Sequence, residues 1–279
     1  MGSTVGVVMA VRNEEGSIGD ALLALSGQTA PPAVVAVVDD GSTDRTAEVL
    51  RGLAGLSFPV KVVSLPFHKE NNVGKPELAR TLNAGLTLVE EFRPQVDYVM
   101  KLDSDHRLPP DYIERMVAKM ASDPRLAVAS GWIQNEPRAA YAPRGSGMVV
   151  SAAFWKEADG MRFPLTYGWE SWTFLKAMQM GYRTASFTDV SSRVSRQTSV
   201  TKGVLYGRGM YALGYDWVFA LGRCLVYASH SPRAGLEMWR GYLDHRGVRR
   251  TDVSEWVGRN QRRMLLRRVA SIVSLGGRR

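Results

Sequence analysis

Short apolar runs of strand length alternate with segments of helical periodicity along the first half of the chain. The runs lie at residues 4–10, 33–38, 59–65, 96–102 and 126–130, and the helical patterns lie at 14–28, 43–53, 75–92 and 110–121. Strands that alternate with helices predict βαβ units and a mostly parallel sheet flanked by helices, which is an α/β fold. The uninterrupted apolar run at 33–38 is typical of a parallel strand that is buried on both faces.

Acidic residues follow two of the predicted strands, at the edge where parallel sheets bind ligands. Asp39 and Asp40 end the second strand, and Asp103 and Asp105 follow the fourth. Asp103 and Asp105, with one residue between them, can hold a divalent metal ion such as Mg²⁺ or Mn²⁺, together with substrate phosphates. Alternatively these acids only begin turns, because Asp, Gly and Ser favour turns. We expect Asp39 to bind a ligand and Asp40 to form the turn.

The alternation weakens beyond residue 130. Residues 131–147 have the composition of a loop, 168–181 predict a helix, and 182–187 predict a strand. The segment 191–202 is polar and basic, and we expect a mobile loop there. We therefore expect an α/β domain over residues 1–195 and a basic helical C-terminal extension over 196–279.

Basic residues are concentrated at the end of the chain. The 279 residues carry a formal charge of +9, and the segment from residue 230 onward, with 12 Arg and four acidic residues, accounts for +8 of it. A predicted helix at 256–275 has one apolar face, formed by Leu265, Val269, Ile272 and Leu275. A basic amphipathic helix favours peripheral contact with an anionic membrane surface. The alternative is a bundle helix packed on residues 210–229. No nucleic-acid-binding motif accompanies the charge, so no nucleic acid partner is expected.

The sequence favours a cytoplasmic location. Residues 1–13 lead directly into the first strand pattern, without the apolar stretch and small-residue cleavage site of a secretory signal. Cys224 is the only cysteine, which excludes a disulfide framework and a Cys-rich zinc site. Residues 210–229 are apolar but are divided by Asp216 and Arg223, and they predict a helix pair more than a membrane span. We expect a protein at the inner face of the cell membrane.

Several motifs occur in an order and spacing known from one family. Asn13-Glu14-Glu15, Leu25-Ser26 and Gln28-Thr29 precede Asp39-Asp40-Gly41-Ser42 with Asp44 and Thr46, and Asp103 and Asp105 follow. With these motifs, the sequence from about residue 4 to 190 resembles the family 2 glycosyltransferases, which have the GT-A fold. The resemblance implies a metal-dependent, inverting glycosyltransferase. Such an enzyme moves a sugar from a nucleotide-diphosphosugar to an acceptor hydroxyl of a glycan or a lipid-linked acceptor.

The resemblance also implies roles for individual residues. Ala10, Val11 and Arg12 would flank the nucleobase, and Asp39 would contact the base or the ribose. Asp103 would serve both the ribose and the metal, with Asp105 as the second metal ligand.

Family members usually carry their catalytic base as the Asp of a Glu-Asp pair on a helix, at a fixed distance before a Gly-Tyr pair. Counted back from Gly181-Tyr182, that position is Glu170. A different register places Ser171 there and leaves no base. We prefer Glu170, because this register needs no gap. The alternative is that Glu170 only interacts with the dipole of its helix.

The sequence departs from the family's pattern in two places. Gly74-Lys75 lies further from the following Leu-Asn motif than in most members, which leaves Lys75 and Arg80 as competing ligands for the donor's phosphates or base. The His that members often carry after the Glu-Asp helix and its following strand is replaced by Ser191-Ser192-Arg193. The third metal or phosphate contact is therefore open, and Arg193, Arg196 and Lys202 are candidates for binding the diphosphate.

Neighbouring aromatic residues and one histidine allow two interpretations. His106 adjoins the paired acids, and we expect an exposed loop residue there. Trp155, Trp169 and Trp172 either stack on sugar rings or belong to the core, and the core is the commoner place for such residues.

Three alternative functions differ in whether they need a catalytic base such as Glu170. A polyprenyl-phosphate acceptor is already ionised and needs no base, whereas a hydroxyl acceptor uses one. A non-catalytic GT-A-like partner protein would account for the missing His. A nucleotidyltransferase has a related sheet, but its Gly-rich N-terminal loop is absent, since Thr4 to Arg12 contains only Gly6.

Overall fold

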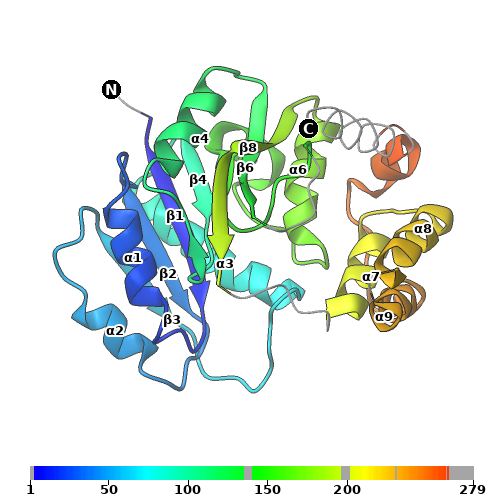
Figure 1. Cartoon of the computed structure of the whole chain (residues 1–279), viewed down its shortest axis with the longest axis horizontal. Coiled ribbons are helices and arrows are strands. Elements are labelled where there is room, and N and C mark those ends of the chain that lie inside the picture. Colours follow the sequence, from blue (N-terminus) through cyan, green and yellow to red (C-terminus); the bar gives the residue numbers. More distant parts are fainter. Residues whose placement is uncertain (1–2, 135–139, 196–201, 230, 262, 264–279) are drawn as a thin grey trace. The chain divides into compact units, whose positions relative to one another are not determined.

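The computed structural model of the chain describes residues 3–134, 140–195, 202–229, 231–261 and 263 (Figure 1). The chain forms two compact units. Unit 1 comprises residues 1–71, 80–163 and 181–196, and unit 2 comprises 72–79, 164–180 and 197–279. The domain boundary expected after residue 195 stays a prediction.

Unit 1 contains an eight-stranded sheet of order β3-β2-β1-β4-β7-β6-β8-β5. The strands are β1 (Val5–Val11), β2 (Val34–Asp39), β3 (Val60–Ser64), β4 (Tyr98–Lys101), β5 (His106–Arg107), β6 (Leu126–Ile133), β7 (Met148–Ser151) and β8 (Arg183–Val194). The pairs β1–β2, β2–β3 and β1–β4 are parallel, as the alternation of strands and helices predicts. The α/β architecture expected from the sequence is confirmed.

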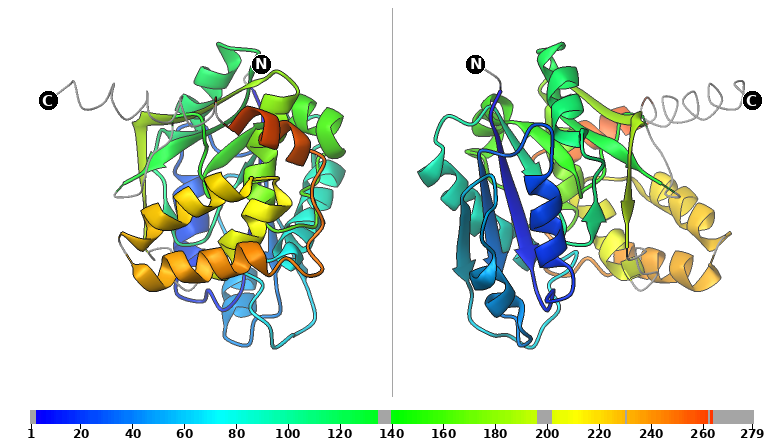
Figure 2. Two further views of the ribbon diagram at one scale, coloured as in Figure 1. Left: turned by 90° about the vertical axis from the view of Figure 1, so that its right-hand side faces the viewer. Right: turned by 60° about the vertical axis from the view of Figure 1, so that its left-hand side comes forward.

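Helices cover both faces of this sheet (Figure 2). They are α1 (Ile18–Ser26), α2 (Thr46–Gly52), α3 (Pro76–Phe92), α4 (Tyr112–Ala121) and α5 (Ala152–Asp159). On one face, alternate residues of β1 from Val5 to Val11 join α1 and α4 in the hydrophobic core. On the other face, α3 lies so close to β1 that a Cβ added at Gly85 would be 2.6 Å from a methyl group of Val8. Burial of β1 and β2 on both faces explains why their sequences are apolar throughout.

A short antiparallel strand joins the two halves of the sheet. β7 pairs with β4 on one side and with β6 on the other, and it is antiparallel to both, so the complete sheet is mixed. Sequence periodicity does not predict β7, because its four residues are too few to show a pattern. The loop expected over 131–147 is wrong for residues 131–133, which continue β6 and pair with β8, whereas residues 140–147 lie outside helices and strands and 135–139 lie outside the described residues.

The last long strand extends further than its sequence suggests. β8 continues to Val194, pairs with β6 through Ser191 and Ser192, and pairs with β5 through Arg193. The prediction of a mobile loop over 191–202 is therefore wrong for residues 191–194, whose polar side chains do not prevent strand pairing. Residues 196–201 lie outside the described residues.

Unit 2 is helical. Its helices include α6 (Trp169–Gln179), α7 (Gly203–Ala212), α8 (Trp217–Ala228) and α9 (Pro232–Leu243). Glycines allow α9 to pack closely against its neighbours: a Cβ added at Gly207 in α7 would be 2.0 Å from the carbonyl oxygen of Met238. The segment after α9 is attached to α6 through Asp252. The Asp252 carboxylate accepts hydrogen bonds from Trp172 Nε1 at 2.6 Å and Lys176 Nζ at 2.5 Å.

The end of the chain is described only in part. Residues 254–261 are helical, whereas most of the predicted amphipathic helix at 256–275, including all four residues of its apolar face, lies outside the described residues. Among the helices that the structure describes, none combines the length and the apolar character that a membrane crossing requires.

Candidate functional site

The carboxyl ends of three neighbouring strands form the candidate site. Val11 pairs with Asp39 and Val8 pairs with Lys101, so β2, β1 and β4 end side by side. This register brings the predicted residues Ala10, Val11, Arg12 and Asp39 to one edge of the sheet, and the chain reaches Asp103 directly after β4. Open α/β sheets bind ligands at this edge.

Asp39 and Asp40, at the end of β2, make different contacts. Asp39 Oδ1 accepts a hydrogen bond from Ser42 N at 2.9 Å, which forms the turn. Asp40 is 5% exposed; it accepts a hydrogen bond from Thr81 Oγ1 at 2.9 Å, and its Oδ2 lies 3.2 Å from His68 Nε2. Asp39 therefore takes part in the turn. Asp40 holds α3 and the segment after β3 against the end of β2, and ligand binding by Asp39 and the turn role of Asp40 stay predictions.

Arg12 contacts the same segment after β3. Its Nη1 lies 3.0 Å from His68 Nδ1, and its guanidinium also donates to the carbonyl oxygens of His68 and Glu70. Because a guanidinium only donates, His68 Nδ1 is an acceptor, and the ring hydrogen is on Nε2, facing Asp40. Arg12 therefore orders residues 68–70 beside the site, and its contact with a nucleobase stays a prediction.

Lys101, a residue that sequence reasoning missed, is buried beside the paired acids. It ends β4 and is 4% exposed, and its Nζ lies 2.7 Å from Asp103 Oδ1. A buried ammonium group is costly unless it is paired, so this ion pair fixes the Asp103 carboxylate against the end of β4. The available signal was a lysine between the apolar residues Met100 and Leu102 at the end of the fourth strand.

His106 is buried, contrary to the prediction of an exposed loop residue. It is 2% exposed, with Nδ1 2.7 Å from Ser146 Oγ and Nε2 2.7 Å from Ser192 Oγ. Burial lowers the pKa of His106 to about 4, so its ring is neutral at neutral pH. The prediction is wrong because the two hydroxyl partners come from segments 40 and 86 positions further along the chain.

The neutral ring of His106 is the centre of a chain of hydrogen bonds. Asp103 N donates to Ser146 Oγ at 3.0 Å, and Ser192 Oγ donates to the carbonyl oxygen of Trp132 at 3.4 Å. Every donor and acceptor in this chain is satisfied when Ser146 Oγ donates to Nδ1 of His106 and Nε2 of His106 donates to Ser192 Oγ. The chain connects the turn that carries the acids to β6 and β8.

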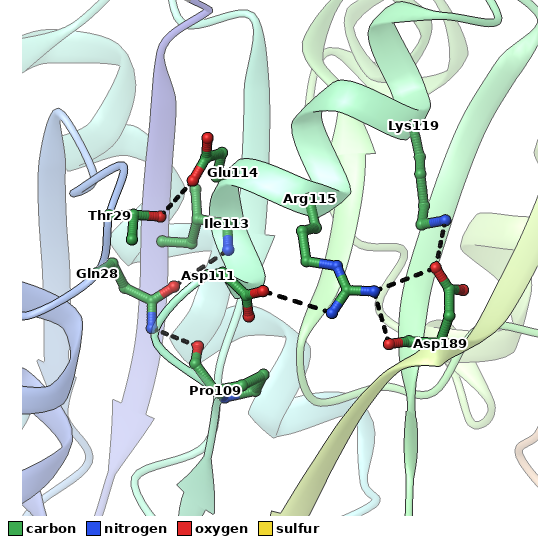
Figure 3. Close-up of polar contacts among 9 residues, drawn as sticks. All are labelled: Gln28, Thr29, Pro109, Asp111, Ile113, Glu114, Arg115, Lys119 and Asp189. Atoms are coloured by element: carbon green, nitrogen blue, oxygen red, sulfur yellow. Dashed lines mark hydrogen bonds and ion pairs between the residues drawn. The ribbon is translucent and has the colours of Figure 1, made fainter.

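The Gln28-Thr29 motif holds the segment that follows the paired acids (Figure 3). Gln28 is 5% exposed; its Nε2 donates to the carbonyl oxygen of Pro109 at 2.8 Å, and its Oε1 accepts from Ile113 N at 3.1 Å. Thr29 N donates to the carbonyl oxygen of Pro110 at 2.9 Å. These contacts satisfy backbone groups at the start of α4 and fix the path of the chain just beyond the site.

Arg193 lies in the strand pair next to the acids. It pairs with Arg107 across β8 and β5, and Ser195 N donates to the carbonyl oxygen of Asp105 at 3.0 Å. The Arg193 Nε donates to Gln134 Oε1 at 2.7 Å. The structure thus brings the backbone of Arg193 close to Asp105, while a contact between its guanidinium and a diphosphate stays a prediction.

The remaining candidates are divided between the two units. Arg80 is exposed in α3, directly before the Thr81 that contacts Asp40. Lys75 and Glu170 belong to unit 2, where Glu170 lies half-buried in the first turn of α6 after Gly168, whose φ is +75°. The predicted residues that unit 1 brings together are therefore Ala10, Val11, Arg12, Asp39, Asp103, Asp105 and Arg193.

The three tryptophans are core residues. Trp155, Trp169 and Trp172 are 1–2% exposed. The Trp155 ring packs edge-on against Phe163, with ring centroids 4.7 Å apart. Stacking of these rings on a sugar is not compatible with this burial.

The acids fit a divalent cation that is shared with a ligand. Asp103 and Asp105 supply two carboxylates, and within the described ranges no group of three or more His, Cys, Asp or Glu side chains is arranged to hold a metal ion. Mg²⁺ is usually bound by one or two carboxylates together with substrate phosphates. Both ring nitrogens of His106 already have hydroxyl partners, so His106 does not extend the set. The donor set therefore fits a cation whose other ligands come from a bound diphosphate.

Sequence comparisons match one family. The model of glycosyl transferase family 2 matches residues 6–190. Over 100 residues the chain is 33% identical to a chondroitin synthase from Pasteurella multocida strain Pm70 and to a hyaluronan synthase from Pasteurella multocida. Each match covers 36% of this chain and only 9% of the synthase.

Solved structures share the fold. The mannosyltransferase PcManGT from Pyrobaculum calidifontis, in complex with GDP-Man and Mn²⁺, has a TM-score of 0.62 at 20% identity, over 76% of this chain and 63% of that chain. TarS 1–349 of S. aureus in complex with UDP-GlcNAc has a TM-score of 0.54 at 18% identity, over 73% and 64% of the two chains. At these identities the likeness shows the fold, and the GT-A prediction is confirmed.

Proposed function

Because the chain belongs to glycosyl transferase family 2, we propose that it is a metal-dependent, inverting glycosyltransferase. It moves a sugar from a nucleotide-diphosphosugar donor to an acceptor hydroxyl. The observation that carries the proposal is the meeting of Arg12, Asp39 and Asp103 at the ends of three adjacent strands. The presence of GDP-Man in the PcManGT structure and of UDP-GlcNAc in the TarS structure supports a donor of this class.

In the proposed reaction the acceptor oxygen attacks the anomeric carbon of the donor sugar. Glu170 takes the hydroxyl proton as the new carbon–oxygen bond forms. The bond between the anomeric carbon and the diphosphate breaks, the nucleoside diphosphate leaves with the electron pair, and the anomeric configuration inverts. Asp39 binds the base or ribose and Ala10, Val11 and Arg12 border the nucleobase.

Asp103 and Asp105 are the residues that would hold the metal. A divalent cation bound there neutralises negative charge on the diphosphate leaving group. Arg193 is a candidate for the same diphosphate, and Lys75 and Arg80 are competing candidates for the phosphates or the base. The hydrogen bond from Asp103 N to Ser146 Oγ, which also contacts the buried His106, supports this arrangement because it preorganises the turn that carries both acids.

The acceptor is proposed to be a glycan or a lipid-linked molecule at a membrane surface, contacted through the C-terminal helices. Support comes from α8, in which Trp217, Val218, Leu225 and Val226 are each more than half exposed. Exposed apolar helix surfaces in a basic segment are typical of helices that lie on anionic membranes.

Binding to vesicles tests this membrane contact. Combined Leu225→Glu and Val226→Glu substitutions are expected to reduce the fraction that co-sediments with phosphatidylglycerol vesicles at least fivefold, because they add charge where apolar side chains would enter the lipid. The matched control is Leu23→Glu in unit 1, which is 55% exposed and is expected to bind as the wild type does. Equal binding by the double variant, or concentration-dependent dimerisation that the substitutions abolish, would contradict a lipid partner for α8.

The donor proposal is tested by thermal shift with UDP, GDP, CDP and dTDP, each with and without Mn²⁺. One diphosphate is expected to raise the melting temperature, and to do so only with the metal. A ligand at 100 times its dissociation constant stabilises the folded state by about 2.7 kcal/mol, which is readily measured. No shift with any diphosphate would favour a non-catalytic partner protein with the same fold.

A further inference from the structure

Unit 1 contains a buried ammonium group, that of Lys101. Its side chain is 5% exposed, and the Asp103 carboxylate 2.7 Å from its Nζ is 46% exposed. The pair therefore has its positive end inside the protein and its negative end at the surface, at the carboxyl end of β4. Lys101 is the last residue of β4, and strand pairing with Val8 and Met148 fixes its backbone.

The ion pair changes the charge that the acidic turn presents to a cation. Asp103, Asp105 and Lys101 together carry a formal charge of −1 instead of the −2 of the two acids. A positive charge fixed next to Asp103 also repels a divalent cation at short range, where screening by salt is weakest. Two carboxylates with a built-in ammonium are therefore a poor site for a cation alone.

We propose that Lys101 makes cation binding at Asp103 and Asp105 depend on the nucleoside diphosphate. The diphosphate supplies the negative charge that Lys101 cancels, so the cation and the diphosphate bind together and each strengthens the other. By linkage, the factor by which the nucleotide tightens cation binding equals the factor by which the cation tightens nucleotide binding. This inference rests on the proposed function and assigns Lys101 as a positioning residue for Asp103.

Binding of Mn²⁺, measured by its electron paramagnetic resonance signal, tests the inference without any turnover. In the wild type we expect weak binding of Mn²⁺ alone and at least tenfold tighter binding with the diphosphate that thermal shift identifies. Lys101→Met removes the charge and keeps the length of the side chain. It is expected to tighten binding of Mn²⁺ alone at least tenfold and to reduce the coupling between Mn²⁺ and nucleotide by the same factor.

A second lysine–aspartate pair provides a matched control. Lys119 Nζ lies 2.7 Å from Asp189 Oδ2, away from the acidic turn, and Lys119→Met is expected to bind Mn²⁺ as the wild type does. If Lys101→Met does not fold, Lys101→Gln takes its place, because glutamine is neutral but keeps a hydrogen-bond donor for Asp103. The same tightening of Mn²⁺ binding is expected. Unchanged affinity for Mn²⁺ alone in a folded neutral variant would overturn the inference.

The inference and the proposed function fail in different ways. If the wild type binds a diphosphate with Mn²⁺ but the neutral variants show the same coupling, only the role of Lys101 is refuted. If the wild type binds no diphosphate with or without Mn²⁺, the proposed function fails, and the coupling assigned to Lys101 fails with it.

Discussion

Replacement of Asp105 by alanine is expected to lower the rate of sugar transfer at least a thousandfold, which corresponds to about 4 kcal/mol of transition-state stabilisation. Negative charge develops on the diphosphate as it leaves, and a cation held by Asp103 and Asp105 stabilises that charge. The same variant is expected to lose the Mn²⁺-dependent thermal shift with the diphosphate. Initial rates of release of the nucleoside diphosphate, measured with and without added metal, check the first result.

The matched control for Asp105 is Asp111, another carboxylate in the same part of the chain. Asp111 accepts a hydrogen bond from Arg115 Nη1 at 3.4 Å, and Asp111→Ala is expected to retain the rate and the metal dependence of the wild type. The carbonyl oxygen of Asp105 that accepts from Ser195 N remains in the variant, so the local strand pairing is kept. Full activity of Asp105→Ala would rule out the proposed metal role.

Replacement of Glu170 by glutamine is expected to lower kcat by a factor of about 10² to 10⁴ with little change in KM for the donor. Glutamine keeps the size of the side chain but cannot accept the proton of the acceptor hydroxyl. Steady-state kinetics with a hydroxyl acceptor measure both kcat and KM.

Glu255→Gln is the control for Glu170→Gln. Glu255 is also in unit 2, and its side chain is 88% exposed beside Arg259, so its substitution is expected to leave kcat unchanged. Ser171→Ala examines the other register of the Glu-Asp motif and is expected to be fully active. If Glu170→Gln transfers sugar at the wild-type rate, the base assignment is wrong, and an acceptor that is already ionised, such as a lipid phosphate, becomes the better explanation.

The sheet from β1 to β4 and the edge that carries the site were predictable because they depend on local patterns. β2 is apolar at every position except its last, Asp39, and this pattern indicates a strand buried on both faces whose end meets solvent. The order in which parallel strands alternate with helices then places the ends of β1, β2 and β4 on one edge. The family motifs added the roles of Asp39, Asp103 and Asp105, which composition and periodicity do not provide.

What escaped prediction depends on contacts between distant segments. The burial of Lys101 requires β1 and β7 on either side of β4, and the burial of His106 requires Ser146 and Ser192 to be in place. β7 owes its position to two partners that precede it in the chain, and four residues carry no signal of such pairing. Sequence patterns describe a residue's immediate neighbours, so they do not predict contacts with residues far along the chain.

The position of β7 has a consequence for how the protein is made. β4 and β6 each pair with β7, and both are synthesised before it. Until residue 151 has left the ribosome, these two strands keep backbone donors and acceptors without their final partner, and such edges invite pairing with other chains. A nascent chain that ends before β7 already contains the acids at 39, 103 and 105. It lacks the strand that joins the two halves of the sheet.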